Sequence, residues 1–187
     1  MKLFLDGSWT LFLDRDGVIN KRRIDQYLAR WEDFDFLDRA DLAIVKLRNF
    51  FKRIIVVTNQ QGVAKGLTTS FEIDHLHYRL ERTIKERGGH IDKIYYCPHH
   101  EMYQPLCRKP RPGMALQAKE DFADIDFSKS VIVGDFYTDI EMGHVVGMKT
   151  IFINNDGSEW HTRAPEPDYI FPSLFSFAEA VEQMLIK

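Results

Sequence analysis

The sequence predicts an α/β protein with an open, mostly parallel β-sheet between two layers of helices. Short apolar runs alternate along the chain with segments of helical periodicity, which is the order of elements typical of a parallel sheet. Most of these runs are continuously apolar, as expected for strands buried on both faces. Polar residues gather directly after several runs, at the end of the sheet where such folds bind ligands. The strands are expected at 10–13, 54–58, 91–96, 131–133 and 150–153.

Helices fit the segments between the predicted strands. Apolar residues from Ala40 to Phe51 recur at helical spacing. After the second run, Thr69 and Glu72 match a capping box, which predicts the start of a helix there. Further helices are expected at 113–124, 139–146 and 174–185.

Composition and charge narrow the class of protein. The chain has 187 residues, 44% hydrophobic and 28% charged, a balance typical of a globular protein, and we expect one domain over 1–187. A formal net charge of -3 gives no general affinity for nucleic acid. No apolar run is long enough to span a membrane, and the first residues do not resemble a signal peptide. We therefore expect a cytoplasmic protein that is a monomer or a weak dimer.

Two aspartates spaced two apart follow the first apolar run, in the segment Leu-Phe-Leu-Asp-Arg-Asp-Gly-Val at 11–18. Because side chains alternate along a strand, Asp14 and Asp16 would point into the same pocket. Carboxylates held so close repel each other, and Mg²⁺, which prefers oxygen ligands, would compensate their charge. One carboxylate could then attack phosphorus while the other transfers the proton of the leaving group. The alternative is a strand end with solvated aspartates.

A second acidic pair, Asp135 and Asp139, follows the short apolar run at 131–133. If this strand lies beside the first one, Asp135 is placed to bind the same metal ion. Asp139 could instead cap the next helix, and we expect it to have a supporting role.

Groups suited to binding phosphate lie between the two acidic pairs. Thr58 ends the second apolar run, and its hydroxyl could donate to a phosphoryl oxygen, although Thr-Asn is also common in turns. Lys109 could neutralise a phosphoryl group, and Arg108 could hold a second anion through two parallel hydrogen bonds. A solvated basic pair is the alternative for these two residues taken alone.

Together these motifs have a fixed order along the chain. A strand followed by the candidate nucleophile comes first, then a strand that ends in a hydroxyl side chain, then a lysine, and finally a strand followed by the second acidic pair. Over residues 10–155 this order resembles the haloacid dehalogenase-like (HAD) superfamily of phosphohydrolases. The resemblance implies a Rossmann-like three-layer sandwich without a large cap domain, and a small phosphorylated metabolite as substrate. The branch of D,D-heptose 1,7-bisphosphate and histidinol phosphatases is similar in three segments: Asp-Arg-Asp-Gly-Val-Ile-Asn at 14–20, Thr-Asn-Gln-Gln-Gly-Val-Ala-Lys-Gly at 58–66 and Cys-Arg-Lys-Pro-Arg-Pro-Gly-Met at 107–114.

The resemblance also implies a reaction and a role for each motif residue. The reaction would be Mg²⁺-dependent hydrolysis of a phosphate monoester, with a sugar phosphate such as D-glycero-D-manno-heptose 1,7-bisphosphate favoured and histidinol phosphate as the alternative. Asp14 would be the nucleophile that carries an aspartyl phosphate, and Asp16 the general acid and base. The other implied roles are Thr58 and Lys109 on the transferring phosphoryl group, Asp14, Asp135 and the backbone carbonyl of Asp16 on Mg²⁺, and Asn59, Gln60 and Arg108 on the rest of the substrate.

The segment 97–112 departs from this branch, which often carries a zinc loop before Arg-Lys-Pro. Cys97 and His99 match the first half of that loop and Cys107 its last ligand, but Pro105 stands at the remaining cysteine position. A closed structural Zn²⁺ site has four ligands, so this one lacks a ligand. We expect partial zinc binding or two free thiols, since a reducing compartment disfavours a disulfide.

Residues 20–37 depart from the branch as well. Lys21, Arg22 and Arg23 stand near the position of a Gly-Tyr-Val stretch that the branch usually carries. This basic cluster could contact a second phosphate or carboxylate of the substrate, or it could be a solvated face.

Two other classes of protein are alternatives to a phosphatase. A signalling receiver domain also carries a phosphorylated aspartate, but on its third strand and apart from its first acidic pair. The early Asp-x-Asp and the late Gly-Asp-x-x-x-Asp argue against that class. A catalytically inactive regulator is disfavoured because all the core motif residues are present.

Overall fold

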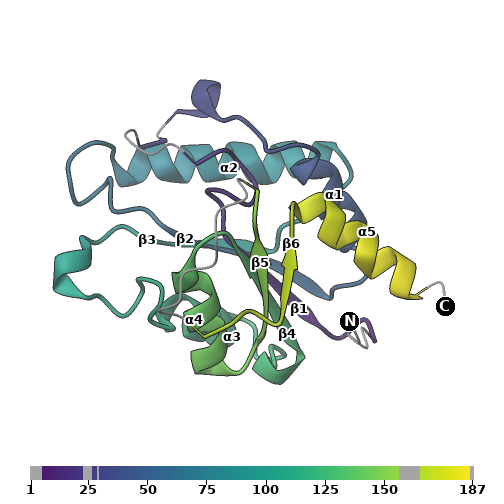
Figure 1. The fold of residues 1–187 in the computed structure, drawn as a ribbon. Helices are drawn as coiled ribbons and strands as arrows, with labels where there is room; N and C mark the ends of the chain where they lie inside the picture. The colour runs from purple at the N-terminus through teal and green to yellow at the C-terminus, as the bar shows by residue number, and fades with distance from the viewer. Residues whose placement is uncertain (1–5, 23–26, 29, 156–164, 186–187) are drawn as a thin grey trace.

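A six-stranded parallel sheet forms the centre of the protein (Figure 1). The computed structural model describes residues 6–22, 27–28, 30–155 and 165–185. The strands lie in the order β3-β2-β1-β4-β5-β6, and every neighbouring pair is parallel, which confirms the predicted α/β fold. The strands are β1 (Thr10–Leu13), β2 (Arg53–Asn59), β3 (Lys93–Cys97), β4 (Ser130–Gly134), β5 (Lys149–Ile153) and β6 (Tyr169–Phe171).

Helices cover both faces of the sheet and make two hydrophobic cores. Leu11 and Leu13 of β1 face one core, which includes side chains of α1, α2 and α5. Phe12, between them, faces the other core with side chains of α3 and α4. The helices are α1 (Ala40–Leu47), α2 (Ser70–Glu86), α3 (Gly113–Asp121), α4 (Tyr137–Val146) and α5 (Leu174–Leu185), with the short 3-10 helices η1 (Trp31–Asp33), η2 (Glu101–Tyr103) and η3 (Phe127–Lys129).

The start of α2 confirms the predicted capping box. The backbone N–H of Glu72 donates to the Thr69 hydroxyl at 3.2 Å, and the Thr69 N–H donates to the Glu72 carboxylate at 2.8 Å. Two of the N–H groups that a helix start leaves without partners are thereby satisfied. The buried face of α2 consists of Ile73, Leu76, His77, Leu80 and Ile84.

The strand order reverses beside β1, which pairs with β2 on one side and β4 on the other. In open α/β sheets a crevice opens at the carboxyl ends of the strands at such a reversal. The Asp14 N–H donates to the Val133 carbonyl at 2.9 Å and ties the end of β1 to β4. Between β1 and β2 the described residues contain the helices η1 and α1.

The structure differs from the predicted elements at several places. β6 was not predicted, because it is only three residues long and none of them is buried. α3 ends at Asp121 rather than Asp124, and β3 runs over 93–97 rather than 91–96. The Asp92 carboxylate accepts from the Ile54 N–H at 2.8 Å, a side-chain contact that replaces regular strand pairing there. Within the described ranges, no helix has both the length and the apolar character needed to cross a bilayer.

Candidate active site

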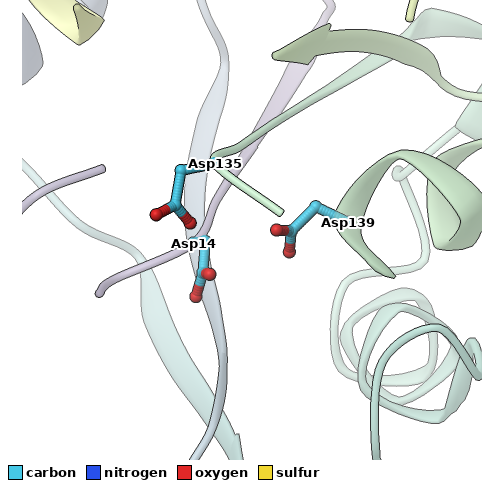
Figure 2. Close-up of side chains that lie close together, drawn as sticks. All are labelled: Asp14, Asp135 and Asp139. Carbon is cyan, nitrogen blue, oxygen red and sulfur yellow. The ribbon is translucent and has the colours of Figure 1, made fainter. Parts of the chain in front are cut away.

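Three carboxylates meet at the carboxyl ends of β1 and β4. Asp14 follows β1, Asp135 follows β4, and Asp139 lies in the first turn of α4. One oxygen of each lies within 4.8 Å of the others, and Figure 2 shows the three groups close together. Burial raises the pKa of Asp135 to about 6, although the Arg22 guanidinium opposes this shift. Oxygen ligands of this kind suit Mg²⁺, so the residues present fit such an ion.

Two glycines make room for these carboxylates. Gly17 has a φ of 90°, in the region that favours glycine, and a Cβ there would lie 1.7 Å from Asp135 Oδ2. A Cβ at Gly134 would lie 2.2 Å from the Cβ of Asp139. The glycine in each acidic motif therefore lets an acidic side chain approach the backbone closely.

Lys109 contacts two of these carboxylates and is almost fully buried. Its Nζ is 2.8 Å from Asp14 Oδ1 and 2.6 Å from Asp139 Oδ1, and it donates to the Val57 carbonyl at 2.9 Å. Burial disfavours the charged amine, but the two carboxylates outweigh that effect and raise the pKa of Lys109. A fixed positive charge thus touches Asp14.

The Arg22 guanidinium contacts the Asp135 carboxylate and the backbone carbonyl of Asp16. Its Nη2 and Nε donate to the Asp135 carboxylate at 2.5 and 3.1 Å, and Nη2 lies 3.2 Å from the Asp16 carbonyl oxygen and 3.9 Å from Asp14 Oδ2. Burial disfavours its charge, yet the bond to Asp135 raises the pKa of Arg22. Lys21 instead pairs with Asp35 at the surface. The third member of the predicted basic cluster, at position 23, lies outside the described residues.

The Asp16 carboxylate is held from several sides. Arg15 Nη2 lies 3.0 Å from both of its oxygens, Asn20 Nδ2 donates to Oδ1 at 2.8 Å, and Gln60 Nε2 donates to Oδ2 at 2.8 Å. Burial alone would raise the pKa of Asp16, but the charge of Arg15 and these hydrogen bonds together lower it. This carboxylate has a fixed orientation at the edge of the cleft.

The motif at the end of β2 lines the cleft but mainly supports other site residues. The Thr58 hydroxyl accepts from Gln60 Nε2 at 2.8 Å, the same amide that holds Asp16. Asn59 exchanges two hydrogen bonds with the backbone of Lys109, at 3.0 and 3.1 Å. The amides of Asn59 and Gln60 are thus engaged with the site itself, in addition to facing the cleft.

A cleft of about 650 Å³ is lined in part by Asp14, Asp16 and Lys109. Arg108 lines it, with Nη2 paired to Glu101 at 3.2 Å, while its buried Nη1 has no hydrogen-bond partner among the described residues. Arg111 donates to Gln104 at 2.7 Å in the same wall. Lining residues to which the sequence assigned no role include Tyr27, Leu28, Gln61, Phe136, Tyr137 and Thr138.

The two cysteines correct the expectation of free thiols. Cys97 and Cys107 are joined in a disulfide, with their Cα atoms 5.3 Å apart. The loop after β3 brings them within the usual distance for such a bond, and bonded sulfurs offer no thiolate to a metal. Among the described residues, Asp14, Asp135 and Asp139 form a potential metal-binding group, whereas Cys97, His99 and Cys107 do not.

Sequence reasoning missed two buried residues behind Asp16. Arg15 has no exposed surface although it stands between two motif aspartates. His77 is buried on the apolar face of α2, and its Nε2 lies 2.9 Å from Arg15 Nη1. A polar residue on an otherwise apolar helix face is the signal that could have identified His77.

The sequence is similar to proteins of established family over nearly its full length. Residues 106–177 match a family model described as HAD-hydrolase-like. The chain is 38% identical to a D-glycero-alpha-D-manno-heptose-1,7-bisphosphate 7-phosphatase of Mycobacterium bovis, over 93% of this chain and 92% of that protein. It is 32% identical to a D-glycero-beta-D-manno-heptose-1,7-bisphosphate 7-phosphatase of Escherichia coli K12, over 92% and 93% of the two chains.

Solved structures of similar fold include a protein of the same kind as these relatives. The D,D-heptose 1,7-bisphosphate phosphatase from B. bronchiseptica, solved with magnesium and phosphate, has a TM-score of 0.85 and 27% identity. That similarity covers 94% of this chain and 99% of the other. An L-2-haloacid dehalogenase from Xanthobacter autotrophicus has a TM-score of 0.57 and 11% sequence identity. The similarity covers 82% of this chain and 64% of the dehalogenase chain, and it shows a shared fold alone.

Proposed function

The chain belongs to the haloacid dehalogenase-like phosphatases, which hydrolyse phosphate esters, and we propose that its substrate is D-glycero-D-manno-heptose 1,7-bisphosphate, cleaved at position 7. The names of the relatives divide between the α and β anomers, so the proposal covers both. The observation that carries it is Arg108, which lines the same cleft as Asp14 and Lys109 and whose buried Nη1 has no hydrogen-bond partner within the described part of the chain. A guanidinium there can bind a second phosphate. Cytoplasmic location and a monomeric or weakly dimeric state remain predictions from the sequence.

The first half of the proposed reaction transfers the phosphoryl group to Asp14. A carboxylate oxygen of Asp14 attacks phosphorus and forms an acyl phosphate, while the bond to the sugar oxygen breaks. Asp16, in its protonated form, gives its proton to that leaving oxygen. The Lys109 ammonium, in contact with Asp14, reduces the repulsion between the anionic carboxylate and the anionic phosphate.

The second half regenerates the enzyme. Water attacks the phosphorus of the acyl phosphate, and the Asp16 carboxylate takes a proton from that water. The bond from phosphorus to Asp14 breaks, which releases phosphate and restores both carboxyl groups. The hydrogen bonds that fix Asp16 favour its anionic form, which is the form that this half requires.

Asp14, Asp135 and the backbone carbonyl of Asp16 would hold Mg²⁺, which when bound supplies positive charge next to the transferring phosphoryl group. The three buried carboxylates and the room left by Gly17 support this assignment. The Arg22 guanidinium contacts the same three groups. Binding of the ion therefore requires Arg22 to move away from them.

We expect Arg22→Gln to bind Mg²⁺ about tenfold more tightly than the wild type, a gain of about 1.4 kcal/mol, because the competing guanidinium is absent. Isothermal titration calorimetry on metal-free protein measures this affinity directly. Lys21→Gln is the matched control, since it removes a charge from the same loop at an exposed residue that pairs with Asp35. Equal affinities for all three proteins would show that Arg22 does not compete with the ion.

The proposed substrate is tested by measuring phosphate release from heptose 1,7-bisphosphate, histidinol phosphate and 4-nitrophenyl phosphate, each with and without Mg²⁺. We expect the highest kcat/KM for the bisphosphate, with the 1-phosphate as the remaining product. A preference for histidinol phosphate would show that the proposed sugar substrate is wrong, but the assignment to the family would still hold.

Arg108→Lys separates recognition of the second phosphate from the reaction itself. We expect KM for the bisphosphate to rise, because an ammonium cannot make two parallel hydrogen bonds to the second phosphate. The rise should correspond to the loss of one charge-assisted hydrogen bond, about 1.5–3 kcal/mol of binding free energy. KM for 4-nitrophenyl phosphate should stay close to the wild-type value. Arg111→Lys, in the same wall, is the control. Equal effects on both substrates would assign Arg108 to the reacting phosphate or to the scaffold.

A further inference from the structure

A buried arginine stands directly behind the carboxylate of Asp16. Arg15 has no exposed surface and does not line the cleft, so it does not face a substrate. Its Nη2 contacts both oxygens of Asp16 at 3.0 Å, and its Nε lies 3.3 Å from one of them. One edge of the guanidinium therefore holds the Asp16 carboxylate in two places.

The other edge of this guanidinium meets His77. Arg15 Nη1 lies 2.9 Å from His77 Nε2, and His77 is 6% exposed. A guanidinium only donates hydrogen bonds, so the histidine nitrogen that faces it accepts through a lone pair. Burial and the neighbouring charge of Arg15 keep the pKa of His77 well below its usual value, which keeps the ring neutral.

His77 is itself restrained by the fold. It lies on the buried face of α2, a 17-residue helix whose start is secured by the Thr69 capping box. Its ring meets the ring of Tyr96 from β3 edge-on, with the centroids 5.4 Å apart. The position of the accepting nitrogen is thus set by two elements of the sheet-and-helix framework rather than by a loop.

We propose that His77 is a positioning residue for phosphoryl transfer, which orients Arg15 and, through it, the acid and base group Asp16. This inference rests on the proposed role of Asp16. Without an acceptor at His77, one arm of a fully buried guanidinium would lose its partner, and an unsatisfied buried donor is costly. Arg15 would then turn to find another acceptor and release its hold on the carboxylate. Asn20 and Gln60 would still donate hydrogen bonds to Asp16, so its carboxylate would become more mobile but would stay in the site.

The test compares two aryl phosphates that differ in how much their leaving group needs a proton. Phenyl phosphate leaves as a basic phenolate and depends on an acid, whereas 4-nitrophenyl phosphate leaves as a stable anion. The single-turnover rate at which each substrate releases its leaving group, phenol or 4-nitrophenol, measures the first half-reaction alone. We expect His77→Leu to slow phenyl phosphate at least tenfold more than 4-nitrophenyl phosphate, and His77→Gln, which keeps an acceptor, to recover most of that loss.

His77→Asn, whose acceptor is too short to reach Arg15, should show the same selective loss and serves if His77→Leu fails to fold. His75→Gln, at an exposed position of the same helix, is the matched control and should match the wild type. An equal loss on both substrates would overturn the proposal and leave His77 a purely structural residue.

Asp16→Asn separates failure of this inference from failure of the proposed function. If Asp16→Asn shows the selective loss on phenyl phosphate and the His77 variants do not, the positioning role is wrong. If Asp16→Asn itself lacks that selectivity, the acid role of Asp16 is wrong and the inference falls with it.

Discussion

Asp14→Asn is expected to reduce kcat by at least about a thousandfold, a loss of about 4 kcal/mol of transition-state stabilisation. An amide is a poor nucleophile, so the acyl phosphate cannot form. The change also removes one of three carboxylates that lie within 4.8 Å of one another. Steady-state phosphate release at saturating Mg²⁺ measures the loss, and acid trapping of labelled enzyme tests for the covalent intermediate.

The fold should survive this substitution, because Lys109 keeps its contacts with Asp139 and the Val57 carbonyl. The melting temperature of Asp14→Asn should therefore equal or exceed that of the wild type. Asp38→Asn, at an exposed aspartate that pairs with Arg39, is the control for the loss of one negative charge. Retention of more than about a tenth of the wild-type rate, a loss of under about 1.4 kcal/mol, would rule out Asp14 as the nucleophile.

Lys109→Met should have the second large effect, on both stability and turnover. The substitution leaves Asp14 and Asp139 buried beside each other without their shared cation. Removing one partner of a buried ion pair typically costs about 3–5 kcal/mol of folding free energy. Urea unfolding of metal-free protein measures that cost, and phosphate release measures the catalytic loss.

A double variant separates the two effects of Lys109→Met. Adding Asp139→Asn removes one of the uncompensated carboxylates and should restore most of the stability. Turnover should stay low, because the positive charge next to Asp14 is still missing. If turnover returned together with stability, Lys109 would be a structural residue only.

The stability defect of Lys109→Met should also depend on pH. Burial raises the pKa of Asp139 to about 7 against the attraction of Lys109, and removing Lys109 removes that opposition. A carboxyl group whose pKa is raised by folding is best tolerated when protonated, so stability falls as pH rises through its folded pKa. The difference from the wild type should therefore be larger at pH 8 than at pH 5. A pH-independent difference would contradict this account.

Short apolar runs predicted the strands well, because burial on both faces leaves few residue types possible at each position. The two acidic motifs and Lys109 could be assigned to one site because each follows a strand, and parallel strands end at the same edge of the sheet. β6 escaped prediction for the converse reason: an edge strand of three partly exposed residues carries no apolar run.

The contacts between site residues were harder to predict, because they depend on how loops fold back. For Arg22 the sequence left open a contact with the substrate or a solvated face, and its pairing with the Asp135 carboxylate, which joins two distant segments, was not predicted. Asn59 and Gln60 were expected to face substrate; both line the cleft, and their amides also hold Lys109 and Asp16, which the sequence did not indicate. The disulfide depends on the path of a proline-rich loop, which residue spacing does not determine.

The pairing of β1 with β4 has a consequence for how the protein acquires activity. Asp14 is synthesised early, whereas Asp135 and Asp139 follow only after β2, β3 and α3 have been made. Closing such a long loop is entropically costly and slow, so the contact between β1 and β4 forms late relative to local helices. Until then Asp14 is an ordinary solvated aspartate. Recovery of turnover during refolding would therefore report the docking of β4 onto β1, and not the earlier formation of secondary structure.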